Sequence, residues 1–258
     1  MLFRSCVTEP DNPPHQRTSV LIVPRSTPGI EVIREVAVGL EAGEGHHTYL
    51  RYNDVRVPRE NLLGPRGGAF VVMQTRMGHA RLALASRALG QIRRAYDLMC
   101  ERVISRETKG ERLSNKQLVQ EHVAEAWLTY QQFRLLVMQT AWKLDNAHND
   151  FKAVRADIAA VKIMLPRALN DVASRAAQVH GSLGVSREMP FGAMVNTAMT
   201  YAVADGPSEV HKVTLARQEL SRYRPHDGLW PNYHLPTLRQ QARDRYADVL
   251  ARHAEPAR

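Results

Sequence analysis

The segment YAVADGPSEVHK, residues 201–212, places one acid, Asp205, directly after a run of apolar residues and before Gly-Pro. The simplest interpretation of this segment is local structure, because Asp-Gly-Pro-Ser-Glu is a favourable start for a helix. Gly206 would then be the N-cap, Pro207 would take the first helical position and Glu209 the third. An acid that follows apolar residues can also face a ligand, so local structure and function both remain open for Asp205.

Three other segments carry residue types that suit anion binding or a close approach of backbone to a ligand. Arg81 lies in MGHARLAL, beside Gly78 and His79, where a surface arginine on a helix is the plain alternative. Arg106 opens the run RETKG, and its guanidinium offers a fork of donors that matches phosphate oxygens. The segment QVHGSLG, residues 178–184, has two glycines that would also serve simply as a helix C-cap and a loop.

Strands are predicted to precede these segments. Short apolar or alternating runs occupy residues 19–24, 31–39 and 46–58, and the last run alternates with the period of a half-buried strand. Three strands cannot close a sheet around a core of their own. We therefore expect the chain to begin inside a β domain.

After Gly64 the apolar residues recur with a helical period. Helices are predicted at six places: residues 85–103, 126–144, 154–179, 189–204, 207–223 and 237–253. Pro166 should kink the third helix without ending its pattern. Long amphipathic helices with short connections favour an antiparallel bundle, and the last, polar helix is expected to be an accessory or interface element.

Composition is ordinary for a globular protein, with 44% hydrophobic and 24% charged residues among 258. No apolar run approaches the roughly 18 residues of a membrane span, and no signal peptide is recognisable. Cys6 and Cys100 form no spacing motif, which suggests a reducing, cytoplasmic setting. The adjacent His46 and His47 would point to opposite faces of a strand, so no metal site is expected there.

The net charge of +9 makes anionic partners worth considering. A solvated basic surface is the plain interpretation, and phosphate-bearing cofactors are the main alternative. Nucleic acid is the weaker alternative, because the arginines are spread through the helices and no basic run is interleaved with aromatic residues.

The order of these parts resembles the C-terminal three-fifths of an acyl-CoA dehydrogenase, in the branch that reads Asp-Gly-Pro instead of Glu-Gly-Thr. The resemblance rests on the strands, YNDVRVPRENLLG, the long helices, HGSLGVS and ADGPSEVHK, and it extends from about Val20 to Leu220. It implies a mainly α fold, with a C-terminal four-helix bundle preceded by the end of a β-barrel-like middle domain. Residues 1–64 would be the end of that middle domain, 65–222 the bundle, and 223–258 an accessory tail.

The resemblance implies a catalytic role for Asp205 as the base that removes the α-proton of an acyl-CoA while flavin N5 accepts the β-hydride. A carboxylate suits this role where an apolar wall raises its pKa above the ordinary value of about 3.9. Tyr201, Val203 and Ala204 could supply such a wall. Arg81 matches the arginine that the family keeps beside the catalytic acid.

The resemblance also implies substrate and cofactor contacts. Gly78, His79 and Gly206 match positions that face the substrate. FAD is the implied cofactor, and its expected contacts on this chain are Arg106, Lys109, Gln117, Gln178, His180, Gly181 and Glu209. Lys109 departs from the family, which usually has an aromatic residue there. Ser182 and Leu183 likewise replace smaller residues in the loop that approaches the partner's cofactor.

Expected partners are an acyl-CoA, an electron-transferring flavoprotein as acceptor, and further copies of the chain in a dimer or tetramer. The resemblance places the residues around the flavin ring and the acyl pocket upstream of Met1, so a hetero-oligomer that supplies this missing half is also possible. Three functions remain open: acyl-CoA dehydrogenation by a partial chain, a non-catalytic oligomerisation subunit, and an anion- or nucleic-acid-binding helical protein.

Overall fold

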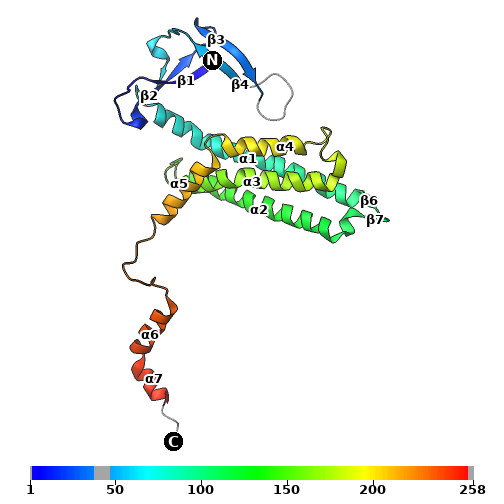
Figure 1. Ribbon diagram of the computed structural model, residues 1–258, viewed down its shortest axis with the longest axis vertical. Coiled ribbons are helices and arrows are strands. Elements are labelled where there is room, and N and C mark those ends of the chain that lie inside the picture. Colours follow the sequence, from blue (N-terminus) through cyan, green and yellow to red (C-terminus); the bar gives the residue numbers. More distant parts are fainter. Residues whose placement is uncertain (1, 38–46, 255–258) are drawn as a thin grey trace. The chain divides into compact units, whose positions relative to one another are not determined.

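The computed structural model describes residues 2–37 and 47–254 (Figure 1). The end of the strand predicted over 31–39 and His46, which opens the next, therefore lie outside the described residues. The chain divides into two compact units, residues 1–217 and 218–258.

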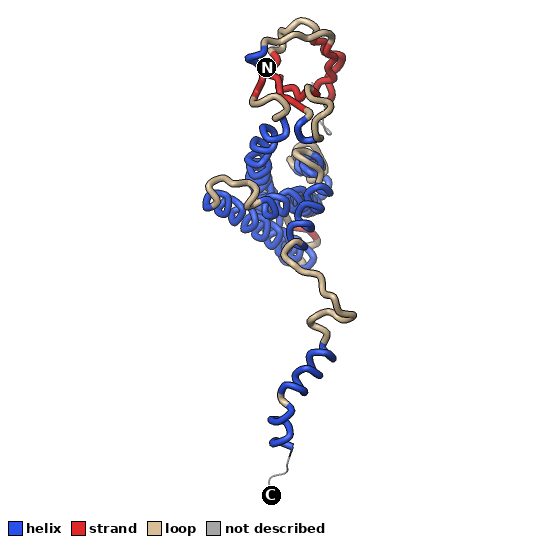
Figure 2. Tube along the Cα trace, turned by 90° about the vertical axis from the view of Figure 1, so that its left-hand side faces the viewer, coloured by secondary structure: helices blue, strands red, loops and turns tan. Residues whose placement is uncertain are grey.

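The first unit begins with short antiparallel strands, drawn red in Figure 2. Their bounds are β1 Leu2–Val7, β2 Thr18–Val23, β3 Ile30–Val36, β4 His47–Tyr52 and β5 Leu62–Leu63. β2 lies between β1 and β5, and β3 pairs with β4. The sequence predicts β2, β3 and β4 but misses β1. Polar residues in the middle of β1 interrupt the alternation of apolar and polar residues by which a strand is recognised. β1 is identified only by its backbone pairing, in which Arg4 lies opposite Leu21.

The prediction that β4 is half-buried is wrong. Five of its six residues are exposed and only Leu50 is partly buried. The physical reason is that β3 and β4 form a two-stranded ribbon, and in the described part of the chain no further strand pairs with it. Exposed side chains connect the two strands instead, as in the 2.9 Å ion pair between Arg51 and Glu31.

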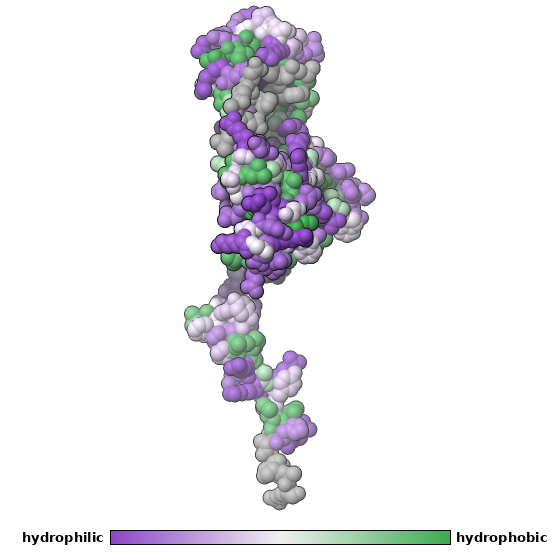
Figure 3. Space-filling model, turned by 90° about the vertical axis from the view of Figure 1, so that its right-hand side faces the viewer, coloured by the Kyte–Doolittle hydropathy of each residue, from purple (hydrophilic) through white to green (hydrophobic). Residues whose placement is uncertain are grey.

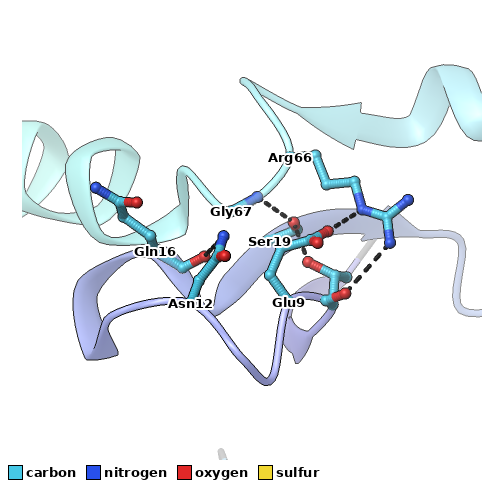
Figure 4. Close-up of polar contacts among 7 residues, drawn as sticks. Glu9, Asn12, Gln16, Ser19, Arg66 and Gly67 are labelled. Carbon is cyan, nitrogen blue, oxygen red and sulfur yellow. Dashed lines mark hydrogen bonds and ion pairs between the residues drawn. The ribbon is translucent and has the colours of Figure 1, made fainter.

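Polar contacts fix the start of the first long helix to the strands (Figure 4). Arg66 forms an ion pair with Glu9, and the Gly67 N–H donates to the fully buried Ser19 Oγ at 2.8 Å. Gly67 has φ +77°, and a Cβ there would lie 2.7 Å from the carbonyl oxygen of Gln16. Only glycine satisfies both conditions, so the junction depends on it.

Four helices form the predicted antiparallel bundle and confirm the fold class (Figure 1). Their bounds are α1 Ala69–Ser105, α2 Gln117–Asn146, α3 Arg155–His180 and α4 Phe191–Val203. α3 packs against the other three and carries Pro166 inside it. The predicted apolar stripes supply the large, fully buried side chains of the core, among them Ile92, Met99, Phe133, Leu165 and Leu169.

A small hairpin that the sequence does not predict joins α1 to α2. β6 (Glu107–Thr108) pairs with β7 (Glu111–Arg112). The two residues of its turn, Lys109 and Gly110, both have positive φ, +53° and +81°. Two successive residues at positive φ are the geometry that a two-residue hairpin requires.

The second unit is helical. α5 (Ser208–Leu220) spans the boundary, and α6 (Leu235–Arg245) and α7 (Ala247–Ala254) follow where a single helix was predicted. Tyr246 separates them because its backbone, at φ −111° and ψ 20°, leaves the helical region. The surface of this tail mixes hydrophobic and hydrophilic groups, whereas the bundle face in Figure 3 is largely hydrophilic. Across the described residues, every helix is too short or too polar to cross a membrane.

Candidate active site

Asp205 lies in the connection between α4 and α5, where the backbone turns sharply. Ala204 is extended (ψ 146°), Asp205 has φ +54° and Gly206 has φ +100°. Aspartate is one of the few non-glycine residues that enter this left-handed region readily. The predicted helix start is wrong by one residue, since α5 begins at Ser208. Gly206 is not the N-cap, because that position needs extended dihedral angles that φ +100° excludes.

Two side chains from different helices converge on the backbone carbonyl of Asp205. Arg81 Nε, from α1, donates to this oxygen at 3.0 Å, although it lies 124 residues earlier in the chain. His211 Nε2, from α5, lies 3.4 Å from the same oxygen. A carbonyl oxygen only accepts hydrogen bonds, so His211 carries its proton on Nε2 when it makes this bond.

A buried lysine holds the other carbonyls of this connection. Lys162 is fully buried, and its Nζ donates to the carbonyl oxygens of Tyr201 and Ala204, both at 2.7 Å. Sequence reasoning missed Lys162. The sequence carries one signal for it, because Lys162 lies on the apolar stripe of α3, between Ile158 and Leu165, where a hydrophobic core residue is expected.

Burial lowers the pKa of each of the three basic side chains at this connection, Arg81, Lys162 and His211. Burial is the largest cause that lowers the pKa of Arg81 below its usual value; the Asp205 carboxylate opposes this shift and Arg155 adds to it. Burial likewise lowers the pKa of Lys162 below 10.5, with Asp205 again opposing. Burial first, and Arg81 second, lower the pKa of His211 below 6.5. Asp205 is therefore the acid that offsets a cluster of cationic groups.

His211, which the sequence reasoning also missed, should make stability depend on pH. Its native pKa lies below the 6.5 of an unfolded chain, so the unfolded state binds the proton more tightly. The contribution is fully present above about pH 6.5 and is lost as the pH falls through the lower native pKa. The free energy of unfolding in urea, measured from pH 7.5 to 5, should fall more for the wild type than for His211→Asn. A difference that stays constant with pH would contradict this.

A cavity of about 610 Å³ adjoins the Asp205 connection. Its lining comes from α1, the α2–α3 connection, the start of α3 and α5, and includes the cationic Lys152 and Arg155. Arg81 and His211 both line this cavity and both bond to the Asp205 carbonyl. Asp205 itself is not a lining residue, and Arg81 and His211 join its backbone to the cavity wall.

Gly78 and His79, both predicted to face the substrate, line this cavity together with Phe151. The His79 and Phe151 rings meet edge to face at 4.5 Å between centroids. A Cβ on Gly78 would lie 2.4 Å from Cδ1 of Phe151, so the absence of a side chain lets that ring close onto α1.

Gly78→Ala should therefore destabilise the protein, by about 1–3 kcal/mol from overpacking. The matched control is Gly90→Ala in the same helix, where an added Cβ meets nothing within 4 Å. That control should gain up to about 1 kcal/mol, because alanine is the better helix former. Urea unfolding of both variants measures the difference, and equal effects at the two glycines would contradict the packing argument.

The predicted apolar wall is only partly present. Tyr201 is buried, with 7% of its surface exposed. Val203, the last residue of α4, is 69% exposed, so its part in such a wall stays a prediction.

The predicted cofactor contacts lie mostly at the opposite end of the bundle. Arg106 follows α1 by one residue, 25 residues after Arg81, which is about 37 Å along a helix. Leu113 N–H donates to the Arg106 carbonyl at 2.8 Å, which holds the start of α2 against it. The side chains of Arg106, Lys109 and Gln117 are all exposed.

The end of α3 lies at this same end of the bundle. Arg175 Nη1 is 3.3 Å from His122 Nδ1, which sets the last turns of α3 beside the first turns of α2. Gln178 is exposed, and Gly181 ends α3 at φ +67° with open space where a Cβ would stand. His180 is different, because its ring is buried and Nδ1 donates to the Ala176 carbonyl at 2.7 Å.

Glu209 belongs to neither group. Its side chain is exposed on the first turn of α5 and pairs with Lys212 at 3.3 Å. The structure does not bring it to Asp205's cavity or to the Arg106 end of the bundle.

A second hollow, of about 580 Å³, lies between the end of α1 and the start of α2. Its lining is mostly apolar and includes Val103, Val119 and Trp127. Ser114 and Gln120 also line it, so it opens beside Gln117.

Comparison with known proteins gives one consistent family. Residues 67–220 match the family model described as "Acyl-CoA dehydrogenase, C-terminal domain". "Probable acyl-CoA dehydrogenase FadE2" of Mycobacterium tuberculosis is 39% identical over 83% of this chain and 52% of its own length. "Acyl-CoA dehydrogenase family member 11" of Gallus gallus is 38% identical over 80% of this chain and 26% of its own length.

Solved structures agree. The acyl-CoA dehydrogenase of Geobacillus kaustophilus superposes with a TM-score of 0.75 at 28% identity, over 83% of this chain and 56% of that one. The chain thus spans about half, or less, of the length of the relatives it matches.

Proposed function

Because the chain belongs to the acyl-CoA dehydrogenase family, we propose that it carries the catalytic base for α,β-dehydrogenation of an acyl-CoA thioester. The observation that carries this proposal is the Asp205 connection: Arg81 and His211 hold its backbone at the wall of a cavity. An acid fixed in this way, beside a space large enough for a ligand, suits proton abstraction.

In the proposed reaction, a carboxylate oxygen of Asp205 takes the proton from the α-carbon of the substrate. The hydride leaves from the β-carbon, and the bond between the two carbons becomes double. FAD, when bound, supplies the acceptor for that hydride. Arg81 orients the acid through its backbone carbonyl, and its positive charge interacts favourably with the carboxylate.

The cavity beside Asp205 is the proposed substrate site. Lys152 and Arg155 on its rim offer positive charge to the phosphate groups of a coenzyme A thioester. Gly78, His79 and Phe151 give the same cavity an apolar and aromatic wall. Gly206 stays a proposed substrate contact, because it has no side chain to cover the backbone of the turn, where its φ is +100°.

The residues at the other end of the bundle fit the dinucleotide part of FAD. Gly181 has open space in place of a Cβ, which allows close approach of a ligand to the backbone. The exposed cations Arg106 and Lys109 suit a pyrophosphate, and Gln117 and Gln178 supply amide groups. The apolar hollow beside Gln117 suits an adenine ring.

We propose that His180 contributes through its backbone, because its ring is buried. Glu209 remains a weaker proposed contact, at the exposed start of α5.

One FAD molecule is too short to serve both ends of the same chain, which lie about 37 Å apart along α1. We therefore propose that the cofactor held near Arg106 belongs to a second copy of the chain or to a partner subunit. A homodimer, a tetramer or a hetero-oligomer that supplies the upstream half would each satisfy this requirement. An electron-transferring flavoprotein as electron acceptor and a cytoplasmic location complete the proposal.

Visible absorption of the purified chain, before and after addition of FAD, tests the proposal first. Bound flavin together with deuterium exchange at the α-carbon of an added acyl-CoA is the expected result. A chain that oligomerises but binds neither FAD nor acyl-CoA would instead be a non-catalytic subunit. Salt-sensitive binding of DNA, without flavin binding, would favour a nucleic-acid-binding protein.

A further inference from the structure

The connection that carries Asp205 begins where α4 ends, and a helix end leaves carbonyl groups without helical partners. α4 stops at Val203, so the Tyr201 carbonyl cannot receive the bond that a continuing helix would supply. The Ala204 carbonyl lies just beyond, at the residue whose extended backbone starts the turn. The partner of both carbonyls is Lys162, at 2.7 Å each.

We propose that Lys162 is a positioning residue for the acid Asp205: its ammonium group holds the end of α4 so that Asp205 takes its left-handed conformation beside Arg81. This inference rests on the proposed function of Asp205. Lys162 acts through the backbone of the connection.

Geometry supports this role on both sides of Asp205. Lys162 bonds to the carbonyl of the preceding residue, Ala204, while Arg81 and His211 bond to the carbonyl of Asp205 itself. The two peptide groups that flank the Asp205 α-carbon are thus oriented by side chains from α1, α3 and α5. The left-handed conformation, φ +54°, costs free energy even for aspartate, so contacts on both sides of the residue help to hold it there.

Charge supports the same role. A cation at a helix C-terminus is favourable, because the unpaired carbonyls concentrate negative potential there. Lys162 is fully buried, and its charge is opposed by Arg81 and favoured by the Asp205 carboxylate. The positive charge of Lys162 also contributes, after burial and Arg81, to the lowered pKa of His211. The ammonium group of Lys162 therefore lies where the end of α4 favours a cation.

The test compares Lys162→Met, which keeps an apolar stem and removes the donors, with Lys162→Arg, which keeps a charged donor. Arg175→Met is the matched control. This substitution also removes a half-buried cation from α3, one that pairs with Asp171 at 2.9 Å. Arg175 lies 13 residues after Lys162, which is about 20 Å along the helix.

Hydrogen–deuterium exchange of the peptide covering residues 201–210 measures how firmly the Asp205 connection is held, and it needs neither FAD nor substrate. We expect severalfold faster exchange in Lys162→Met, partial recovery in Lys162→Arg, and no change there in Arg175→Met. Unchanged exchange in Lys162→Met would overturn the proposal. If Lys162→Met does not fold, Lys162→Gln replaces it. Its side chain is shorter and its one donor group is neutral, so exchange should still be faster than in the wild type, by a smaller factor, and unchanged exchange would again overturn the proposal.

The flavin-loaded protein then separates positioning from general stability. In Lys162→Met, kcat for dehydrogenation of an acyl-CoA should fall on the order of 10- to 100-fold while KM changes little. Lys162→Arg should recover part of the lost kcat, because it keeps a charged donor. A loss of kcat equal to that of Arg175→Met, with no recovery in Lys162→Arg, would overturn the positioning role. If the wild type shows no exchange of the α-proton at all, the proposed function fails, while peptide exchange still decides the role of Lys162.

Discussion

Asp205→Asn should abolish exchange of the α-proton of an acyl-CoA, with a rate loss of about 100- to 10,000-fold, the usual contribution of a general base. The amide is nearly isosteric with the carboxylate but cannot accept a proton at neutral pH. Asparagine also tolerates a left-handed backbone, so the φ of +54° should persist. The bonds from Arg81 and His211 should persist too, because they go to the backbone carbonyl. The variant therefore removes the chemistry and keeps the geometry.

The measurement is deuterium incorporation at the α-carbon, with flavin retention checked by visible absorption. Asp205→Glu is the informative control, because it restores the acid on a side chain one methylene longer. Partial activity is expected in that control, since a carboxylate displaced by about 1 Å loses much of its effect. Exchange at the wild-type rate in Asp205→Asn would assign the base to another residue.

Arg81→Met should lower the same exchange rate by about 10- to 100-fold. The substitution keeps an apolar stem in α1 but removes the 3.0 Å bond from Nε to the Asp205 carbonyl. It also removes a positive charge that interacts favourably with the Asp205 carboxylate. Both losses act on Asp205, so kcat should fall more than binding of the thioester weakens.

Arg81→Lys separates the two effects. Lysine restores the charge but cannot reproduce the planar fork of the guanidinium, so only part of the lost rate should return. Arg87→Met, on an exposed turn of the same helix, is the matched control and should leave the rate unchanged. A wild-type rate in Arg81→Met would remove Arg81 from the site.

The helices of the bundle were predictable because their information is local. An apolar residue every three or four positions defines one buried stripe, and these stripes predict α1, α2 and α3. α1 and α2 begin earlier than their stripes, at Ala69 and Gln117. β1 was not predictable in this way, since its partner strand rather than its own pattern makes it a strand. The exposure of β4 likewise depends on what packs against it.

Asp205 was identifiable from its place before Gly-Pro and from the family resemblance, but its neighbours were not all identifiable. Lys162 appears in the sequence as one cation within an apolar stripe. His211 stands within the segment that holds Asp205, where it resembles any polar residue of a helix surface. Neither position carries a local signal of a bond to a distant carbonyl.

The sequence by itself determined the helical periods, the sharp turn before α5 and the acid at that turn, because these depend on residues a few positions apart. Only the tertiary structure decided which side chains meet there. Arg81 is 124 residues from Asp205 in the chain, and Lys162 belongs to a third helix. Their contacts depend on how α1, α3 and α4 pack, and packing is set by the whole core at once. The candidate active site is therefore a product of the bundle, and the Asp205 segment alone does not contain it.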